Sequence, residues 1–196
     1  MNPENHEYDS LFLKMKKTLI ITAHPSSESF THQIATTISA QNKNAEIIDL
    51  YDEKWAMNFL KFESPNEMPE PPVKKVLQEK VAAAHELIFI FPIWNGAEPA
   101  ILKNFYDQVF SAKFAFEYSK KSARGLLHRK TAQFFCTCDG SGVFYRWKIC
   151  PLRATWQFFR MRFCGIQTRH FFVFGKTRKR NKNDRAKILQ KIKKTA

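Results

Sequence analysis

The stretch ELIFIFPIWNGAEPAILKNFYD, residues 86–107, joins a strand pattern to a helix pattern through a tight aromatic loop. Residues 86–91 form a continuous apolar run, which is typical of a strand that helices cover on both faces. Pro92 ends this strand, and a helix is expected to open with Glu98-Pro99. Ligands of open α/β sheets bind just beyond the carboxyl ends of the strands. The loop is therefore the first candidate binding site.

Four further segments share this strand character and alternate with helical patterns. The expected strands cover residues 17–23, 45–50, 86–91, 131–137 and 170–174. Strand–helix alternation with right-handed crossovers gives a doubly wound parallel sheet. We therefore expect an α/β fold of five parallel strands in the order 2-1-3-4-5, with helices on both faces. In this order the switch point lies between the first and third strands.

Apolar stripes at helical spacing lie between the expected strands. The first helix carries Phe30, Ile34 and Ile38, and the third has a wide apolar face that includes Phe105 and Val109. A fourth helix begins near residue 151 and stops before residue 165, a glycine that suits a helix end. The fifth is the basic C-terminal helix.

Length and composition favour one domain with a packed core. The chain has 196 residues, of which 44% are hydrophobic and 19 are Phe. Residues 1–14 are expected to be a flexible arm, and residues 15–196 a single domain. No stretch approaches the roughly 18 apolar residues of a membrane span. The four cysteines lack zinc-type spacing, so we expect reduced thiols, no metal and a cytoplasmic location.

The positive charge is unevenly placed along the chain. The formal net charge is +14, and residues 176–196 hold ten Lys/Arg against one Asp. One interpretation is a solvated terminal helix with a basic flank. Ile188, Leu189 and Ile192 give this helix a narrow apolar stripe. The other is an electrostatic surface for an anionic partner such as nucleic acid, a membrane surface or a nicotinamide phosphate. No nucleic-acid reader motif accompanies the charge, so no nucleic acid is expected.

Two more loops follow expected strands. The first, residues 24–31, brings many hydroxyls to the start of a helix, whose free N–H groups and dipole attract a phosphate. Ordinary N-capping by one serine is the alternative. The other loop, residues 137–145, holds two glycines that suit close approach of a ligand, although Asp-Gly-Ser-Gly is also a common turn. The three loops share one edge of the sheet, which favours a binding function.

Several strings resemble the NAD(P)H:quinone oxidoreductase family of DT-diaphorase-like flavoproteins. They are AHPSSESF at residues 23–30, FPIWNGAEPAILKNFYD at 91–107, FAFEY at 114–118 and FCGI at 163–166. The resemblance spans about residues 17–175 and implies a flavodoxin-like fold. It also implies a flavin cofactor, FMN or alternatively FAD, with NAD(P)H as electron donor. The expected chemistry is ping-pong hydride transfer through flavin N5 to a quinone or another small-molecule acceptor.

The resemblance also assigns residues to the site. Tyr145 is the candidate catalytic residue, and Phe116 and Tyr118 match the aromatic residues that shape the substrate pocket at a homodimer interface. The cofactor-binding candidates are His24, Ser26, Ser29, Phe30, Thr31, Pro92, Ile93, Trp94, Asn95, Gly96, Thr137, Cys138, Asp139, Gly140 and Tyr145.

This chain departs from the family pattern at two places. Asp139 stands where the family often has glycine, so its carboxylate points to solvent or the flavin is held differently. No histidine follows Tyr145 until His170, and Arg146 or Lys148 is the proposed substitute for it. The alternative function is a flavin-bearing ancillary subunit of a membrane potassium-efflux system, with a peripheral membrane partner. A hydrolase is not expected, because no GxSxG string is present.

Overall fold

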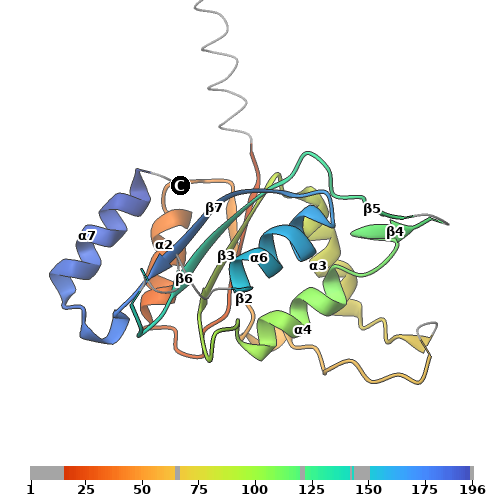
Figure 1. Cartoon of the computed structure of the whole chain (residues 1–196), viewed down its shortest axis with the longest axis horizontal. Coiled ribbons are helices and arrows are strands. Elements are labelled where there is room, and N and C mark those ends of the chain that lie inside the picture. Colours follow the sequence, from red (N-terminus) through yellow and green to blue (C-terminus); the bar gives the residue numbers. More distant parts are fainter. Residues whose placement is uncertain (1–15, 65–66, 120–121, 142, 144–150, 195–196) are drawn as a thin grey trace, which may run out of the picture.

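A five-stranded parallel sheet forms the centre of the molecule (Figure 1). The computed structural model describes residues 16–64, 67–119, 122–141, 143 and 151–194. The strands are β1 (Thr18–Thr22), β2 (Ala45–Asp49), β3 (Glu86–Pro92), β6 (Thr131–Thr137) and β7 (Gln167–Phe174). They lie in the order β2-β1-β3-β6-β7, which is the predicted order 2-1-3-4-5. All four pairings are parallel, so the predicted fold class is confirmed.

Burial explains why the inner strands were easy to predict. β1 is buried along its whole length, and β3 and β6 are buried from their second residue onward. Apolar residues on both faces of these strands therefore produce continuous hydrophobic runs. β7 lies at the edge of the sheet and begins at Gln167, three residues before the predicted start. Its first four residues, 167–170, are polar and most of them are exposed, so no apolar run marks this part of the strand in the sequence.

Helices cover both faces of the sheet (Figure 1). On one face lie α2 (Phe30–Ser39) and α7 (Lys182–Lys193); on the other lie α3 (Pro72–Ala83), α4 (Ala100–Val109) and α6 (Pro151–Ala154). Ile192 of α7 is 3% exposed and belongs to the same core cluster as Phe30 and Ile34 of α2. The basic terminal helix is therefore a packed layer of the fold, as its apolar stripe predicted.

Three local features differ from the sequence-based expectation. α4 begins at Ala100 with Pro99 as its N-cap, two residues later than predicted. The helix that begins with α6 continues as π-helical backbone, η3 (Thr155–Arg162), before the predicted glycine end at Gly165, where φ is +86°. Two short strands, β4 (Phe116–Tyr118) and β5 (Ala123–Gly125), form an antiparallel hairpin that was not predicted. Three-residue strands are too short to show an alternating pattern.

Single-turn 3-10 segments complete the described structure. They are η1 (Glu53–Trp55), after β2, and η4 (Thr177–Lys179), after β7. The second of these segments turns the chain at the carboxyl edge of the sheet, directly beside the loop that follows β6. It therefore carries residues of the C-terminal basic segment to the edge where the predicted site lies.

Candidate functional site

A cleft of about 750 Å³ lies at the carboxyl edge of the sheet. Its walls come from the loops that follow β1, β3, β6 and β7. The lining residues are His24, Ser26, Glu28, Ser29, Phe30, Thr31, Pro92, Ile93, Trp94, Asn95, Thr137, Cys138, Asp139, Gly140, Thr177, Arg178 and Arg185. Loops distant in sequence meet here because parallel strands end at one edge, as the crevice rule for α/β sheets requires.

The lining contains all the predicted cofactor-binding residues except Gly96 and Tyr145. Gly96 forms the turn beside the cleft, and Tyr145 lies outside the described residues, as do Arg146 and Lys148. The predicted substrate residues Phe116 and Tyr118 lie on β4 and do not line this cleft. Sequence reasoning missed four lining residues, which are Glu28, Thr177, Arg178 and Arg185.

The loop after β1 leads into α2 through a serine cap. Ser29 is the N-cap, and its Oγ accepts a hydrogen bond from the backbone N–H of His32 at 3.2 Å. In the part of the chain that is described, the backbone N–H groups of Phe30 and Thr31 have no acceptor. These two N–H groups lie in the first turn of α2, at the positive end of the helix dipole, where backbone N–H groups bind anions. The start of α2 thus combines the predicted capping with an anion-binding arrangement.

The hydroxyl of Thr31 has a structural partner across the cleft floor. Its Oγ1 lies 3.2 Å from Thr137 Oγ1 at the end of β6, and both side chains are buried. The two hydroxyls therefore tie α2 to β6.

His24 stands between the start of α2 and the aromatic loop. Its Nδ1 accepts a hydrogen bond from the N–H of Ser26 at 3.0 Å, and its ring centroid is 6.2 Å from that of Trp94. Burial lowers the pKa of His24, with the nearby His32 adding to the effect. The neutral imidazole is therefore favoured at pH 7.

The loop after β3 is a tight turn that exposes an indole. Trp94 and Ala97 exchange two backbone hydrogen bonds of 2.9 Å, and Asn95 and Gly96 between them have φ values of 49° and 81°. Asn-Gly is the residue pair that such a left-handed turn favours. Trp94 is 43% exposed in the cleft wall. The turn therefore presents a flat aromatic ring and main-chain polar groups to a ligand.

A buried ion pair holds this turn against the π-helical segment. Arg160 Nη2 donates to Glu98 Oε1 at 2.6 Å, and Trp156 Nε1 donates to Glu98 Oε2 at 3.3 Å. The side chains of Arg160 and Glu98 are only 9% and 6% exposed. The guanidinium also lies 4.3 Å from the centroid of the Trp156 ring. The loop is thus fixed by charge and stacking on the side away from the cleft.

The opposite end of the cleft is basic. Arg178 pairs with Asp139 at 2.8 Å, and Asp139 also accepts a hydrogen bond from the hydroxyl of Thr177 at 3.1 Å. The Asp139 carboxylate is therefore neutralised by the segment that follows β7. Arg185 of α7 donates to the carbonyl of Thr177 at 3.2 Å, and its guanidinium lies 5.6 Å from the Phe30 ring centroid.

The hydrogen bonds of Arg185 are incomplete. Its Nε is buried and has no hydrogen-bond partner among the described residues. A buried guanidinium N–H without an acceptor is costly unless a ligand supplies one. Arg185 lines the cleft and adds a positive charge at its α2 end.

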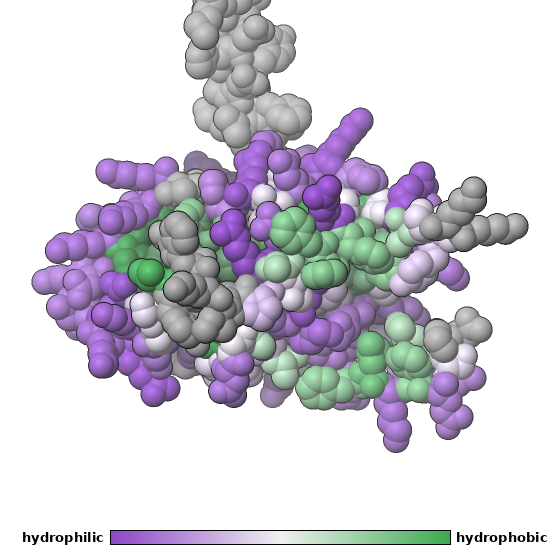
Figure 2. All heavy atoms as spheres, in the orientation of Figure 1, coloured by the Kyte–Doolittle hydropathy of each residue, from purple (hydrophilic) through white to green (hydrophobic). Residues whose placement is uncertain are grey.

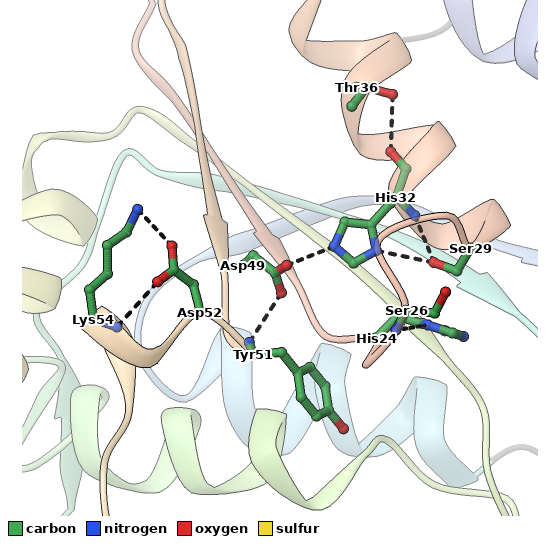
Figure 3. Close-up of polar contacts among 9 residues, drawn as sticks. All are labelled: His24, Ser26, Ser29, His32, Thr36, Asp49, Tyr51, Asp52 and Lys54. Carbon is green, nitrogen blue, oxygen red and sulfur yellow. Dashed lines mark hydrogen bonds and ion pairs between the residues drawn. The ribbon is translucent and has the colours of Figure 1, made fainter.

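Figure 3 shows the polar contacts around the loop after β1. His32 lies between Ser29, at the start of α2, and Asp49, at the end of β2. His24 and Ser26 lie beside this chain of contacts, on the cleft side.

Among the residues with described positions, no group of three or more His, Cys, Asp or Glu side chains is placed to hold a metal ion. Nor does any helix in that part of the chain have the length and apolar character needed to cross a membrane.

Comparison with known proteins places the chain in a family. An FMN-dependent NADH:quinone oxidoreductase of Macrococcus caseolyticus is 32% identical over 141 residues, which cover 60% of this chain and 67% of that protein. NAD(P)H dehydrogenase [quinone] 1 of Rattus norvegicus is 27% identical over 189 residues, covering 79% of this chain and 67% of that protein. The first of these relatives is named an oxidoreductase and the second a dehydrogenase.

A solved structure gives the same fold. The crystal structure of Smu.1420 from Streptococcus mutans superposes with a TM-score of 0.79 at 26% identity, covering 91% of this chain and 97% of that one. Residues 16–196 match the family described by its flavodoxin-like fold. The chain therefore belongs to the flavodoxin-like fold family.

Proposed function

We propose that this protein is a flavin-dependent NAD(P)H oxidoreductase that reduces a quinone or a similar small molecule by two electrons, with FMN as its cofactor. The observation that carries the proposal is the cleft itself. It combines an anion-binding end, at α2 and Arg185, with a flat aromatic wall at Trp94. A flavin mononucleotide has a phosphate at one end and a planar ring system at the other.

The residues that line the cleft fit FMN. Among the described residues, the N–H groups of Phe30 and Thr31 have no acceptor, and Arg185 adds a positive charge beside them, as suits a phosphate site. The cleft volume of about 750 Å³ lies within the range of about 300–1,000 Å³ of small-molecule and cofactor sites. Of the two acidic residues in the lining, Asp139 pairs with Arg178, and Glu28 stands in the loop before α2.

The protein's part in the reaction is to bind and orient. FMN, when bound, supplies two-electron transfer between NAD(P)H and the acceptor. Arg185 and the start of α2 hold the phosphate, and the 93–96 turn sets the position of the ring system. The Glu98–Arg160 pair keeps that turn rigid, so that no energy is spent on ordering it during turnover. Tyr145 remains the predicted catalytic residue, and Phe116 and Tyr118 the predicted substrate residues.

FMN is proposed in preference to FAD on the name of a relative, the Macrococcus enzyme that is described as FMN-dependent. The test is to release any bound flavin from the purified protein with acid and identify it by mass spectrometry. We expect FMN in about one-to-one ratio with the chain. FAD would correct the cofactor, and failure to bind either flavin when both are supplied would contradict the proposal.

A homodimer is proposed as the working assembly. Figure 2 shows hydrophobic surface over the helix that begins with α6 and toward β4 and β5. Exposed aromatic side chains in this region include Phe159, Phe158 and Tyr118, which are 75%, 50% and 73% exposed. Aromatic residues of this kind are enriched at protein interfaces. Sedimentation equilibrium with Phe159→Asp as the comparison variant tests it, since that change should weaken dimerisation.

A cytoplasmic location is proposed from the cysteines. Cys164 is a free, buried thiol, which suits a reducing compartment.

A further inference from the structure

The proposed flavin phosphate site contains a hydrogen-bond chain that ordinary capping does not need. Asp49 Oδ2 lies 2.9 Å from His32 Nε2, and His32 Nδ1 lies 3.1 Å from Ser29 Oγ (Figure 3). Ser29 lines the cleft, whereas His32 and Asp49 stand behind it. The side chains of His32 and Asp49 are 13% and 32% exposed. A partly buried histidine therefore links a carboxylate to the hydroxyl of a residue that lines the cleft.

The direction of each hydrogen bond follows from the chemistry of the groups. An ionised carboxylate only accepts hydrogen bonds, so the Nε2 of His32 carries the proton that Asp49 accepts. In the neutral ring, Nδ1 is then an acceptor. Ser29 must donate its single hydroxyl proton to Nδ1, while its oxygen accepts from the backbone N–H of His32. In this state Ser29 has no proton to offer to an anion in the cleft.

Protonation of His32 reverses the bond to Ser29. Nδ1 then carries a proton and donates it to the serine oxygen, which already accepts from the backbone N–H of His32. Both lone pairs of the oxygen are now occupied, and its proton is free to point into the cleft. The same event adds a positive charge behind the start of α2. Ser29 therefore changes from a group that opposes an anion to one that binds it.

We propose that His32, oriented by Asp49, is a positioning residue that couples the binding of the flavin phosphate to uptake of a proton. The inference rests on the proposed function, because the ligand is the phosphate end of FMN. The groups that face His32 are Asp49 on β2 and His24 after β1, whose ring centroid is 6.4 Å away. The backbone N–H of Tyr51 donates to the other oxygen of Asp49 at 3.1 Å, and burial together with the Asp49 charge raises the pKa of the Tyr51 hydroxyl.

The experiment measures flavin binding to the whole chain between pH 5.5 and 8.5. Calorimetry in buffers of different ionisation enthalpy counts the protons taken up, and flavin fluorescence gives the Kd. FMN is compared with riboflavin, which lacks the phosphate. His32→Gln retains a donor for Asp49 but does not titrate, and His170→Gln is the control because His170 is exposed on β7, outside the cleft.

The wild-type protein and His170→Gln should take up more protons on binding FMN than His32→Gln, by up to about one. The FMN Kd should rise with pH more steeply in the wild type, by up to about tenfold per pH unit. Free FMN titrates identically in every sample, so a difference between variants arises from the protein or from its complex with the phosphate. Riboflavin should show no such difference between wild type and His32→Gln.

Parallel pH profiles and equal proton uptake in wild type and His32→Gln, with FMN bound by both, would overturn this inference and leave the proposed function intact. Failure of the wild type to bind either flavin would overturn both. Should His32→Gln not fold, Asp49→Asn is the second test. Removing the carboxylate charge disfavours protonated His32, so the midpoint of the pH profile should move to lower pH. An unmoved midpoint would overturn the inference.

Discussion

Arg185 is the residue that most directly ties the C-terminal helix to the proposed cofactor. Its guanidinium reaches from α7 to the cleft, lies against Phe30 and leaves its Nε without an acceptor among the described residues. A phosphate at the start of α2 would lie beside its positive charge. Part of the positive charge of the C-terminal segment therefore belongs to the proposed cofactor site. The sequence-based interpretation of this charge as a general electrostatic surface did not include that role.

Arg185→Met should weaken FMN binding by about tenfold or more, because a hydrogen bond to a charged group contributes about 1.5–3 kcal/mol. Binding of riboflavin should change little. Lys187→Met removes the same charge from an exposed position of the same helix outside the cleft and serves as control. Equal losses for FMN and riboflavin, or for both variants, would argue against the assigned role.

His24 gives a pH dependence of stability. Burial lowers the pKa of His24 from its usual value of 6.5, so the unfolded chain binds more protons near and below that pH. The free energy of unfolding should therefore fall as the pH drops below about 6.5. His24→Asn should lose less stability than the wild type between pH 7.5 and 5.5 in urea titrations. Superimposable losses would show that His24 does not contribute.

The cleft residues that could be predicted directly follow strands, whereas those that were missed are placed by tertiary packing. Residues 24–31, 92–95 and 137–140 follow apolar runs directly, so the strand pattern alone brings them to the sheet edge. Arg178 and Arg185 come from a segment whose own pattern indicates only a basic helix. Their position depends on how that helix returns across the edge and packs on α2, which local sequence does not specify.

Among the elements, η3 has a role that was not expected of it. It carries Arg160 and Trp156, whose contacts to Glu98 fix the turn that presents Trp94. π-helical segments frequently occur at functional sites. The apolar pattern predicted a helix here, but pattern alone does not distinguish π from α geometry.

Glu98→Gln should lower the free energy of unfolding by about 3 kcal/mol, because it leaves the buried Arg160 guanidinium without a counter-charge. Glu117→Gln breaks the exposed Glu117–Arg124 pair and should cost no more than about 1 kcal/mol. Chemical denaturation of the two variants makes the comparison. Similar small effects for both would mean that the buried pair does not fix the turn.

The packing of α7 is testable in the same way. Ile192 is 3% exposed in the core cluster that α2 and α7 share. Ile192→Ala should destabilise the protein by about 2–5 kcal/mol through lost burial and the cavity left behind. Val76→Ala, at a 42% exposed position on α3, is the control and should have a small effect. A negligible loss for Ile192→Ala would show that α7 is not part of the folded core.

On the scale of the whole molecule, topology converts separate loops into one site. The strand order was predictable because right-handed crossovers between alternating strands and helices leave few arrangements. β3 and β6 pair in register from Glu86 with Thr131 to Pro92 with Thr137, so their ends are level. The aromatic turn and the Thr137 loop therefore form adjacent walls. The hairpin β4–β5 was not predictable from pattern, because each of its strands has only three residues.

The most direct test of the account is anaerobic reduction of the FMN-loaded protein. Addition of NADH or NADPH should bleach the visible flavin absorption, and a quinone added afterwards should restore it, with two electrons transferred per flavin. A protein that binds no FMN, or whose bound FMN neither nicotinamide donor reduces, would contradict the central claim.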